Sequence, residues 1–279
     1  TWNPFPLLHI NSGVRFSNYD KYDDLIINPR FGLKFNPHSD LALKASWGKY
    51  SQFLYTINQE DELLRIVDFW QPIPDGEKPQ ESEHFIIGSE YWLSDGNTIS
   101  VEAYYKNYKH VYDLNPLTEG TDIEGTLSIA GTGEAAGLEF LYRLRRGKLS
   151  GWISYAYAKI DREIDLNSDG VIWDEREIYP VKYDKPHIFS SILSYELTEK
   201  YDTAFSCVYS SGQTYTPVIG KVHQSGLNAF SGLNNPYSYF GNRYGPKNSG
   251  RYPSYFRMDV SLSKESNTFG LESKWKFQI

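Results

Sequence analysis

The connections between successive strand-like segments alternate between short and long along this chain of 279 residues. Short polar turns lie at 37–40, 94–97, 145–148, 198–202 and 265–267. The long connections centre on 19–27, 52–82, 113–133, 161–184 and 211–253. An up-and-down barrel in an outer membrane has this asymmetry, with tight periplasmic turns and long extracellular loops. The alternation of short and long connections therefore predicts an up-and-down barrel whose long loops bind its partners.

Between these turns, apolar and polar residues alternate with the period of a β-strand. From 41 to 48, Leu41, Leu43 and Trp47 lie on one face, whereas Lys44 and Ser46 lie on the other. In a transmembrane barrel the first face meets lipid and the second meets a polar lumen. About eleven segments alternate in this way, at 8–16, 30–35, 41–48, 85–93, 98–106, 137–144, 149–157, 189–197, 204–209, 256–262 and 269–277.

Half-buried strands of a soluble sandwich also alternate, which leaves open a secreted soluble β-protein that binds glycans. Strand length favours the barrel, because several segments reach about 9 to 11 residues, whereas soluble strands have about 5 or 6. Aromatic residues make up 16% of the chain, and rings near strand ends are typical of girdles at membrane interfaces. The candidate girdle rings are Tyr50, Phe53, Tyr55, Tyr91, Trp92, Tyr108, Tyr112, Tyr155, Tyr157, Tyr252 and Tyr255.

Composition excludes several other classes of protein. A mean hydropathy of -0.53, without any apolar run of about 18 residues, excludes a transmembrane helix. The net charge of -7 disfavours nucleic acid as a partner, because nucleic-acid-binding surfaces are basic. A nucleophile elbow, a zinc-binding helix and a phosphate-binding glycine loop are all missing from the sequence, which indicates that the chain is not an enzyme.

Seven segments follow one another in an order and spacing found in a known family. They are HINSGVRF at 9–16, NPRFGLKF at 28–35, LKASWGKYSQF at 43–53, VEAYYK at 101–106, GLEF at 137–140, LSGWISYAY at 149–157 and YDKPH at 183–187. With these segments, nearly the whole chain resembles the C-terminal part of the barrel of TonB-dependent outer-membrane receptors.

The resemblance implies an all-β, antiparallel up-and-down transmembrane β-barrel, of which residues 1–279 supply about eleven strands of a roughly 22-stranded barrel. It also implies that a plug domain, the first strands and the closing strand lie outside this chain. The expected location is the outer membrane of a Gram-negative bacterium.

The expected function is energy-coupled uptake of a scarce nutrient such as an iron chelate, cobalamin, an oligosaccharide or a peptide. The implied partners are membrane lipid, the nutrient, and the TonB–ExbB–ExbD energy-transducing complex, which would be engaged through an N-terminal segment missing from this chain. No cofactor is required by this function.

Two long connections contain candidate ligand-binding residues. Connections 52–82 and 211–253 combine aromatic rings, which offer contact area at low entropic cost, with hydrogen-bonding side chains. The same residues could equally pack one loop against another. The candidates are Trp70, Tyr215, Tyr237, Tyr239, Arg243 and Tyr244.

A third connection resembles the first eight positions of an EF-hand calcium loop. Oxygen ligands from Asp165, Asn167 and Asp169 precede Gly170, and the carbonyl of Val171 would add a further ligand. The sequence departs from the pattern at position twelve, where Arg176 replaces the bidentate glutamate. Closure by a neighbouring carboxylate, Glu175 or Glu177, is therefore required, and the alternative is a solvated acidic turn.

Overall fold

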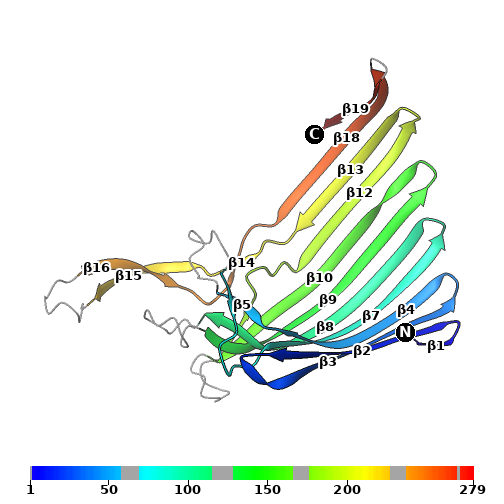
Figure 1. Cartoon of the computed structure of the whole chain (residues 1–279). Coiled ribbons are helices and arrows are strands. Elements are labelled where there is room, and N and C mark those ends of the chain that lie inside the picture. Colours follow the sequence, from blue (N-terminus) through cyan, green and yellow to red (C-terminus); the bar gives the residue numbers. More distant parts are fainter. Residues whose placement is uncertain (1, 58–68, 115–127, 166–175, 227–236, 269–270) are drawn as a thin grey trace.

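The computed structural model describes residues 2–57, 69–114, 128–165, 176–226, 237–268 and 271–279. These residues form strands, turns and loops that build one large curved sheet (Figure 1). Within these ranges, no helix is long and apolar enough to cross a membrane.

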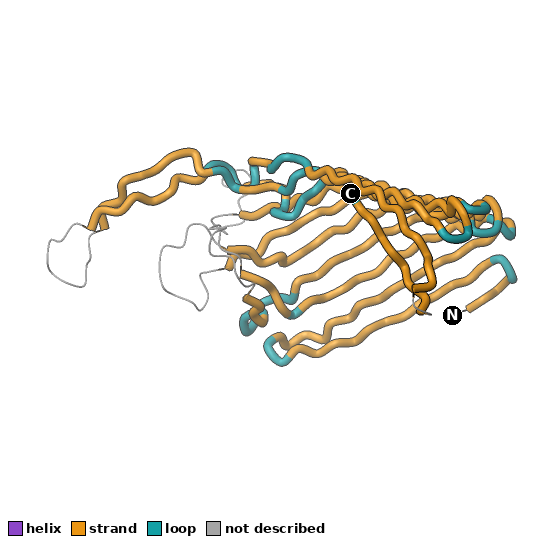
Figure 2. The backbone as a smooth tube through the Cα atoms, turned by 90° about the horizontal axis from the view of Figure 1, so that it is seen from above, coloured by secondary structure: helices purple, strands orange, loops and turns teal. Residues whose placement is uncertain are grey.

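Eleven long strands follow one another in a single 13-stranded antiparallel sheet. They are β2 (Leu8–Tyr19), β3 (Tyr22–His38), β4 (Leu41–Gln52), β7 (Gln80–Ser94), β8 (Asn97–Leu114), β9 (Ser128–Arg146), β10 (Leu149–Asp165), β12 (His187–Thr198), β13 (Tyr201–Ser210), β18 (Tyr255–Thr268) and β19 (Leu271–Gln278). The short β1 (Trp2–Phe5) pairs with β2 at one edge, and β11 (Arg176–Pro180) pairs with the end of β10. The predicted antiparallel sheet of about eleven strands is confirmed, and from above it is curved like a trough (Figure 2).

Tight turns lie together at one end of the sheet, as the sequence predicted for 37–40, 94–97, 145–148 and 198–202. Two of the predicted connections between strands were wrong. The predicted turn at 265–267 belongs to β18, because Asn267 pairs with Glu272 and Thr268 pairs with Leu271. The predicted long connection at 19–27 is a tight turn, because Tyr19 lies opposite Tyr22 and β3 pairs with β2 from there onward.

The register aligns the apolar residues of neighbouring strands into rows. Trp47 of β4 lies opposite Phe85 of β7, which lies opposite Tyr105 of β8. Residues two positions apart on a strand point to the same side, so one face of the sheet is apolar. Leu138 and Met258 on this apolar face are 45% and 55% exposed, which indicates a face that needs an apolar environment.

The other face is polar and carries ion pairs between strands. The Lys44 ammonium lies 2.6 Å from the Glu90 carboxylate, and Lys274 lies 3.1 Å from Asp202. Gly137 lies on this face beneath the ring of Tyr104, at a place where a β-carbon would come within 2.5 Å of that ring. The missing side chain lets the tyrosine lie across the neighbouring strand.

Smaller paired segments lie at the loop end, opposite the tight turns (Figure 1). They are β5 (Leu54–Ile57) with β6 (Phe69–Pro72), β14 (Thr214–Tyr215) with β17 (Gly250–Arg251), and β15 (Val218–Gly226) with β16 (Tyr237–Tyr244). Buried apolar clusters also gather at this end, around Tyr55, Ile73 and Tyr112 and around Ile164 and Tyr179. The described residues of the loop end therefore form paired strands and packed clusters on top of the sheet.

An arginine on the apolar face should block insertion of the barrel into a membrane. For Leu138→Arg we expect a loss of about 2 to 4 kcal/mol, because the charge would lie in hydrocarbon. Leu141→Arg is the matched control, since Leu141 points to the polar face of the same strand. The measurement is the heat-modifiable, membrane-inserted fraction of the complete polypeptide. Equal insertion of the two variants would contradict the assignment of the faces.

Candidate functional site

A cavity of about 610 Å³ lies at the loop end. Its lining comes from β4, β7, β8, β9 and β10, from the β5–β6 hairpin, from β11 and the residues that follow it, and from Lys247 and Asn248 before β17. We call this cavity the mouth pocket. Its aromatic lining residues are Tyr50, Tyr55, Trp70, Tyr108, Tyr112, Tyr179 and Tyr183.

Tyr50 and Tyr108 reach the mouth pocket from the polar face of the sheet. The Arg30 guanidinium lies 4.5 Å from the centre of the Tyr50 ring, and the Tyr50 and His84 rings lie 4.5 Å apart. Tyr108 meets His84 edge-on at 6.3 Å. These contacts join four adjacent strands into one layer of planar groups. The prediction that Tyr50 and Tyr108 belong to a lipid-facing girdle is wrong. Their neighbours in the strands, Lys49 and Asn107, face outward, so these two rings face the polar side of the sheet.

One wall of the mouth pocket is the β5–β6 hairpin. Tyr55 and Ile73 are buried against Tyr112, whose hydroxyl donates a hydrogen bond of 2.8 Å to the Lys78 carbonyl. This packing holds the hairpin on the end of β8. Trp70 lies opposite Thr56 in the hairpin and remains 61% exposed while lining the cavity. An exposed indole on an anchored hairpin is well placed to stack on a ligand.

Segment 73–79, which we call the strap, leads from this hairpin into β7. The Tyr19 hydroxyl donates to the Ile73 carbonyl at 3.0 Å, and the Gly76 amide donates to the Lys21 carbonyl at 2.8 Å. Gly76 has φ of 81°, a conformation that glycine adopts without steric cost. An exposed ion pair of 2.9 Å joins Lys21 to Asp75, and its hydrogen bond raises the lysine pKa. The strap is thus tied to the β2–β3 turn.

The opposite wall is formed by β11 and by residues that precede β17. Tyr179 is buried against Ile164, and the Lys247 ammonium lies 4.8 Å from the centre of the Tyr179 ring. The Lys247 amide donates to the Glu177 carboxylate at 3.2 Å. Asn248 donates from its side chain to the Pro180 carbonyl at 2.8 Å. Two segments far apart in sequence therefore form one surface.

An ion pair anchors this second wall. Arg251 donates to the Asp184 carboxylate at 2.6 Å, and also to the carbonyls of Asp184 and Gly212 at 2.8 and 2.7 Å. Asp184 is only 3% exposed, and this guanidinium offsets the cost of burying its carboxylate. Nearby, the buried Thr214 donates to the Val181 carbonyl at 2.7 Å. The contacts tie the base of the 211–253 connection to the start of β12.

The charges around the mouth pocket are mixed. Arg162, Lys182 and Lys247 contribute positive charge, whereas Glu81 and Asp161 contribute negative charge. Across the described ranges, no group of three or more His, Cys, Asp or Glu side chains could hold a metal ion. Rings combined with scattered donors and acceptors suit the reversible binding of a polar ligand.

Among the predicted ligand-binding residues whose side chains the structure describes, only Trp70 lines the mouth pocket. Tyr215 packs on Tyr252 with ring centres 4.6 Å apart, directly over Gly250. Arg243 and Tyr244 are exposed on β16, in a hairpin that projects away from the sheet (Figure 1). For the other two predicted residues the structure describes only the backbone, within β16: Tyr237 and Tyr239.

The predicted calcium ligands lie mostly outside the described residues. Asp165 ends β10 opposite Arg176, and Glu177 lies opposite Ile164. The remaining candidates fall in the part of the chain that the structure does not describe, namely Asn167, Asp169, Val171 and Glu175.

Sequence reasoning missed most of the mouth pocket. Arg162 could have been found, because it lies on the polar face beyond Ala156 and Ala158 of the same strand. Lys182, Lys247 and Asn248 gave no such signal, because long connections bring them together. Tyr183 was noticed only as part of the YDKPH segment.

The strap should detach from Tyr112 at high pH, where the phenol loses its proton. Burial, aided by the Glu77 carboxylate, raises the pKa of Tyr112 above its ordinary value of 10.0. The neutral phenol therefore stabilises the fold below pH 10, and this contribution is lost as the pH rises through the raised pKa. We expect proteolysis of 73–79 to accelerate above pH 10. Tyr112→Phe should cost about 1 kcal/mol but flatten this dependence; identical pH profiles would contradict this account.

Removing the guanidinium at 251 should loosen the second wall. Arg251→Ala leaves the Asp184 carboxylate buried without its partner, at a cost of about 2 kcal/mol. We expect faster proteolytic cleavage within 211–253, measured against Arg243→Ala, an exposed arginine of the same connection. The anchoring role is refuted if both variants are cleaved at the rate of the wild type.

Comparison with known proteins gives a family and a fold. The sequence matches the family described as TonB dependent receptor-like, beta-barrel, over residues 1–279. The structure is similar to that of the FrpB iron transporter from Neisseria meningitidis (F3-3 variant), with a TM-score of 0.52 and 15% sequence identity. The similarity covers 86% of this chain and 32% of that one. No curated protein sequence matches the chain.

The family match spans every segment that suggested the resemblance, and the structural match supports the barrel fold. The family consists of outer-membrane transport proteins without enzymatic activity. The chain belongs to the TonB-dependent receptors and forms part of their outer-membrane β-barrel.

Proposed function

We propose that this chain forms part of the barrel wall of an energy-coupled importer and supplies one side of its extracellular binding site. The observation that carries the proposal is the mouth pocket, which lies among the anchored loops. In this family's barrels the long loops face outward, so the pocket would be the first surface that a ligand meets.

The remainder of the importer would come from outside these residues. The chain spans about a third of the length of the structure that it matches. We propose that a plug domain, the first strands and the closing strand complete the barrel. Energy would reach the receptor from the TonB–ExbB–ExbD complex through an N-terminal segment. In this proposal the chain itself contributes part of the barrel wall and part of the ligand-recognition surface.

The proposed ligand is a scarce nutrient with ring or polar groups, and the candidate classes are iron chelates, cobalamin, oligosaccharides and peptides. Tyrosine and tryptophan rings would contribute contact area, while Arg162, Lys182 and Asn248 would direct hydrogen bonds. Iron chelates are the class to test first, because the matched structure is described as an iron transporter. The exposed hairpin residues Arg243 and Tyr244 would meet the same ligand from outside.

Calcium binding by 165–177 is a second, separate proposal. Ile164 pairs with Glu177 and Asp165 pairs with Arg176, so the two ends of the proposed calcium loop lie side by side where β10 and β11 meet. The carboxylate and amide oxygens of 165–177 would suit calcium, which prefers oxygen ligands. Chelation of calcium should then speed proteolysis of this connection and lower the thermal midpoint. Unchanged values would refute calcium binding without affecting the importer.

The importer proposal is tested by replacing Trp70. In the complete polypeptide, Trp70→Ala should weaken binding of the transported ligand about tenfold, because a central aromatic contact is lost. The assay is growth and uptake on ferric chelates, cobalamin, oligosaccharides and peptides as the limiting nutrient, followed by equilibrium binding of the nutrient that is transported. Tyr244→Ala, which removes an exposed ring on β16, is the comparison variant and should weaken binding less than Trp70→Ala does.

A larger loss for Tyr244→Ala than for Trp70→Ala would move recognition from the mouth pocket to the β15–β16 hairpin. Failure of the complete polypeptide to support uptake of any of these nutrients would contradict the import function itself.

A further inference from the structure

The tight turn between β9 and β10 concentrates positive charge at the end of the sheet opposite the mouth pocket (Figure 1). It contains Arg145, Arg146 and Lys148 around Gly147, and we call it the basic turn. The tight turns of such barrels face the periplasm. The basic turn therefore lies at the level of the lipid headgroups of the periplasmic leaflet.

Within the basic turn, Arg146 points to the apolar face of the sheet and Arg145 points to the polar face. Arg146 lies on the same side of β9 as Leu138, with an unbroken register between them. In the last two rows of the apolar face from β9 to β19, the charged residues of the described strands are Arg146 and Lys264, both basic. These rows consist of Arg146, Leu149, Tyr195, Thr203, Leu262 and Phe277, and then of Tyr201, Lys264 and Trp275.

Neighbouring strands hold the backbone of the basic turn on both sides. The Asn97 side chain accepts a hydrogen bond of 3.1 Å from the Arg145 amide and donates one of 3.3 Å to the Arg145 carbonyl. On the other side, the Glu196 amide donates to the Lys148 carbonyl at 3.0 Å. Gly147 has φ of 56°, a conformation that glycine adopts without steric cost. The turn therefore presents its side chains on a fixed backbone, which lowers the entropic cost of binding.

The acidic residues near the basic turn do not neutralise it by contact. Asp95 and Glu199 lie in the two adjacent turns, where Lys200 adds another positive charge. In the described part of the chain, neither the Arg146 guanidinium nor the Lys148 ammonium forms an ion pair or a side-chain hydrogen bond. The other carboxylates at this end of β12, β13, β18 and β19 point to the polar face, namely Glu196, Asp202, Glu265 and Glu272.

We propose that the basic turn and the adjoining rows of the apolar face bind an anionic phospholipid of the periplasmic leaflet, whose headgroup carries a phosphate but no ammonium. Arg146 and Lys148 donate to the phosphate oxygens. The acyl chains lie along the apolar face, where Gly151 has no side chain between Leu144 and Leu193 and lets a chain approach the backbone. This inference rests on the outer-membrane location of the chain and is independent of the transported ligand.

Charge complementarity selects an anionic headgroup over a zwitterionic one. An ethanolamine headgroup brings its own ammonium into a region where basic side chains predominate. Only Asp95 or Glu199 of the described turns beside the basic turn could accept from that ammonium, and each belongs to a different turn. The attraction of basic side chains for anionic lipid increases with each added charge, so Lys200 and Lys264 strengthen the preference.

The test is native mass spectrometry of the complete polypeptide, released from bilayers that contain equal amounts of phosphatidylglycerol and phosphatidylethanolamine. The wild type should retain phosphatidylglycerol in preference to phosphatidylethanolamine. The double variant Arg146→Gln/Lys148→Gln should retain about tenfold less phosphatidylglycerol, as expected when charge-assisted hydrogen bonds are lost.

The controls separate lipid binding from folding and from net charge. Arg145→Gln removes a positive charge from the same turn but on the polar face, and should retain phosphatidylglycerol like the wild type. Arg146→Lys/Lys148→Arg keeps both charges and should also retain it, while heat-modifiable migration reports whether each barrel is folded. Equal retention of the two lipids by the wild type, unchanged retention by the glutamine double variant, or an equal loss in Arg145→Gln would each overturn the proposal.

Discussion

The pairing register between neighbouring strands is the constraint on which the rest of this structure depends. Each strand of the main sheet satisfies its backbone groups by pairing with the strands beside it, and this pairing also decides which side chains share a row. A shift of one residue would move Leu138 and its apolar neighbours into the lumen and bring charged residues such as Glu139 against lipid. The separation of the two faces therefore helps to fix the register, in addition to the hydrogen bonds between strands.

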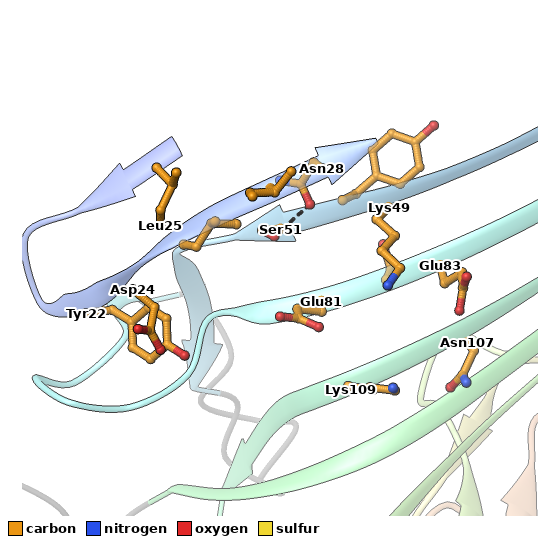
Figure 3. A pocket seen from close by; sticks show the side chains of 14 residues that line it. Tyr22, Asp24, Leu25, Asn28, Lys49, Ser51, Glu81, Glu83, Asn107 and Lys109 are labelled. Atoms are coloured by element: carbon orange, nitrogen blue, oxygen red, sulfur yellow. Dashed lines mark hydrogen bonds between the residues drawn. The ribbon is translucent and has the colours of Figure 1, made fainter. Parts of the chain in front are cut away.

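Two cavities occur where this regular pattern ends. The mouth pocket begins where β4, β8 and β10 extend beyond the apolar band, and anchored loops close around it. A second cavity, lined by residues that include Tyr22, Lys49 and Glu81, begins where β3 and β4 separate at Pro29 (Figure 3). Inside the band, the pairing leaves little freedom to vary the lining. Beyond it, the chain can place rings and charges for recognition, which explains why both cavities are found at the loop end.

Two sets of contacts with different chemistry each hold one wall of the mouth pocket in place. Tyr112, Tyr55 and Ile73 hold one wall by burying apolar surface. The other wall is held by an ion pair between the exposed Arg251 and the buried Asp184. A binding surface on a loop loses affinity if the loop must be ordered when the ligand arrives. Anchoring both walls in advance removes part of that cost, while Trp70 and Lys247 are left to line the cavity.

The amino-acid sequence alone determined the barrel, the number of long strands and the separation of faces, because a period of two and the contrast between short and long connections are local signals. It also singled out Trp70, an exposed ring in a long connection. It could not place the turn at Tyr19 or the meeting of Lys247 with Tyr179. Those were decided by tertiary structure, because contacts between long connections depend on where distant strands bring their ends together.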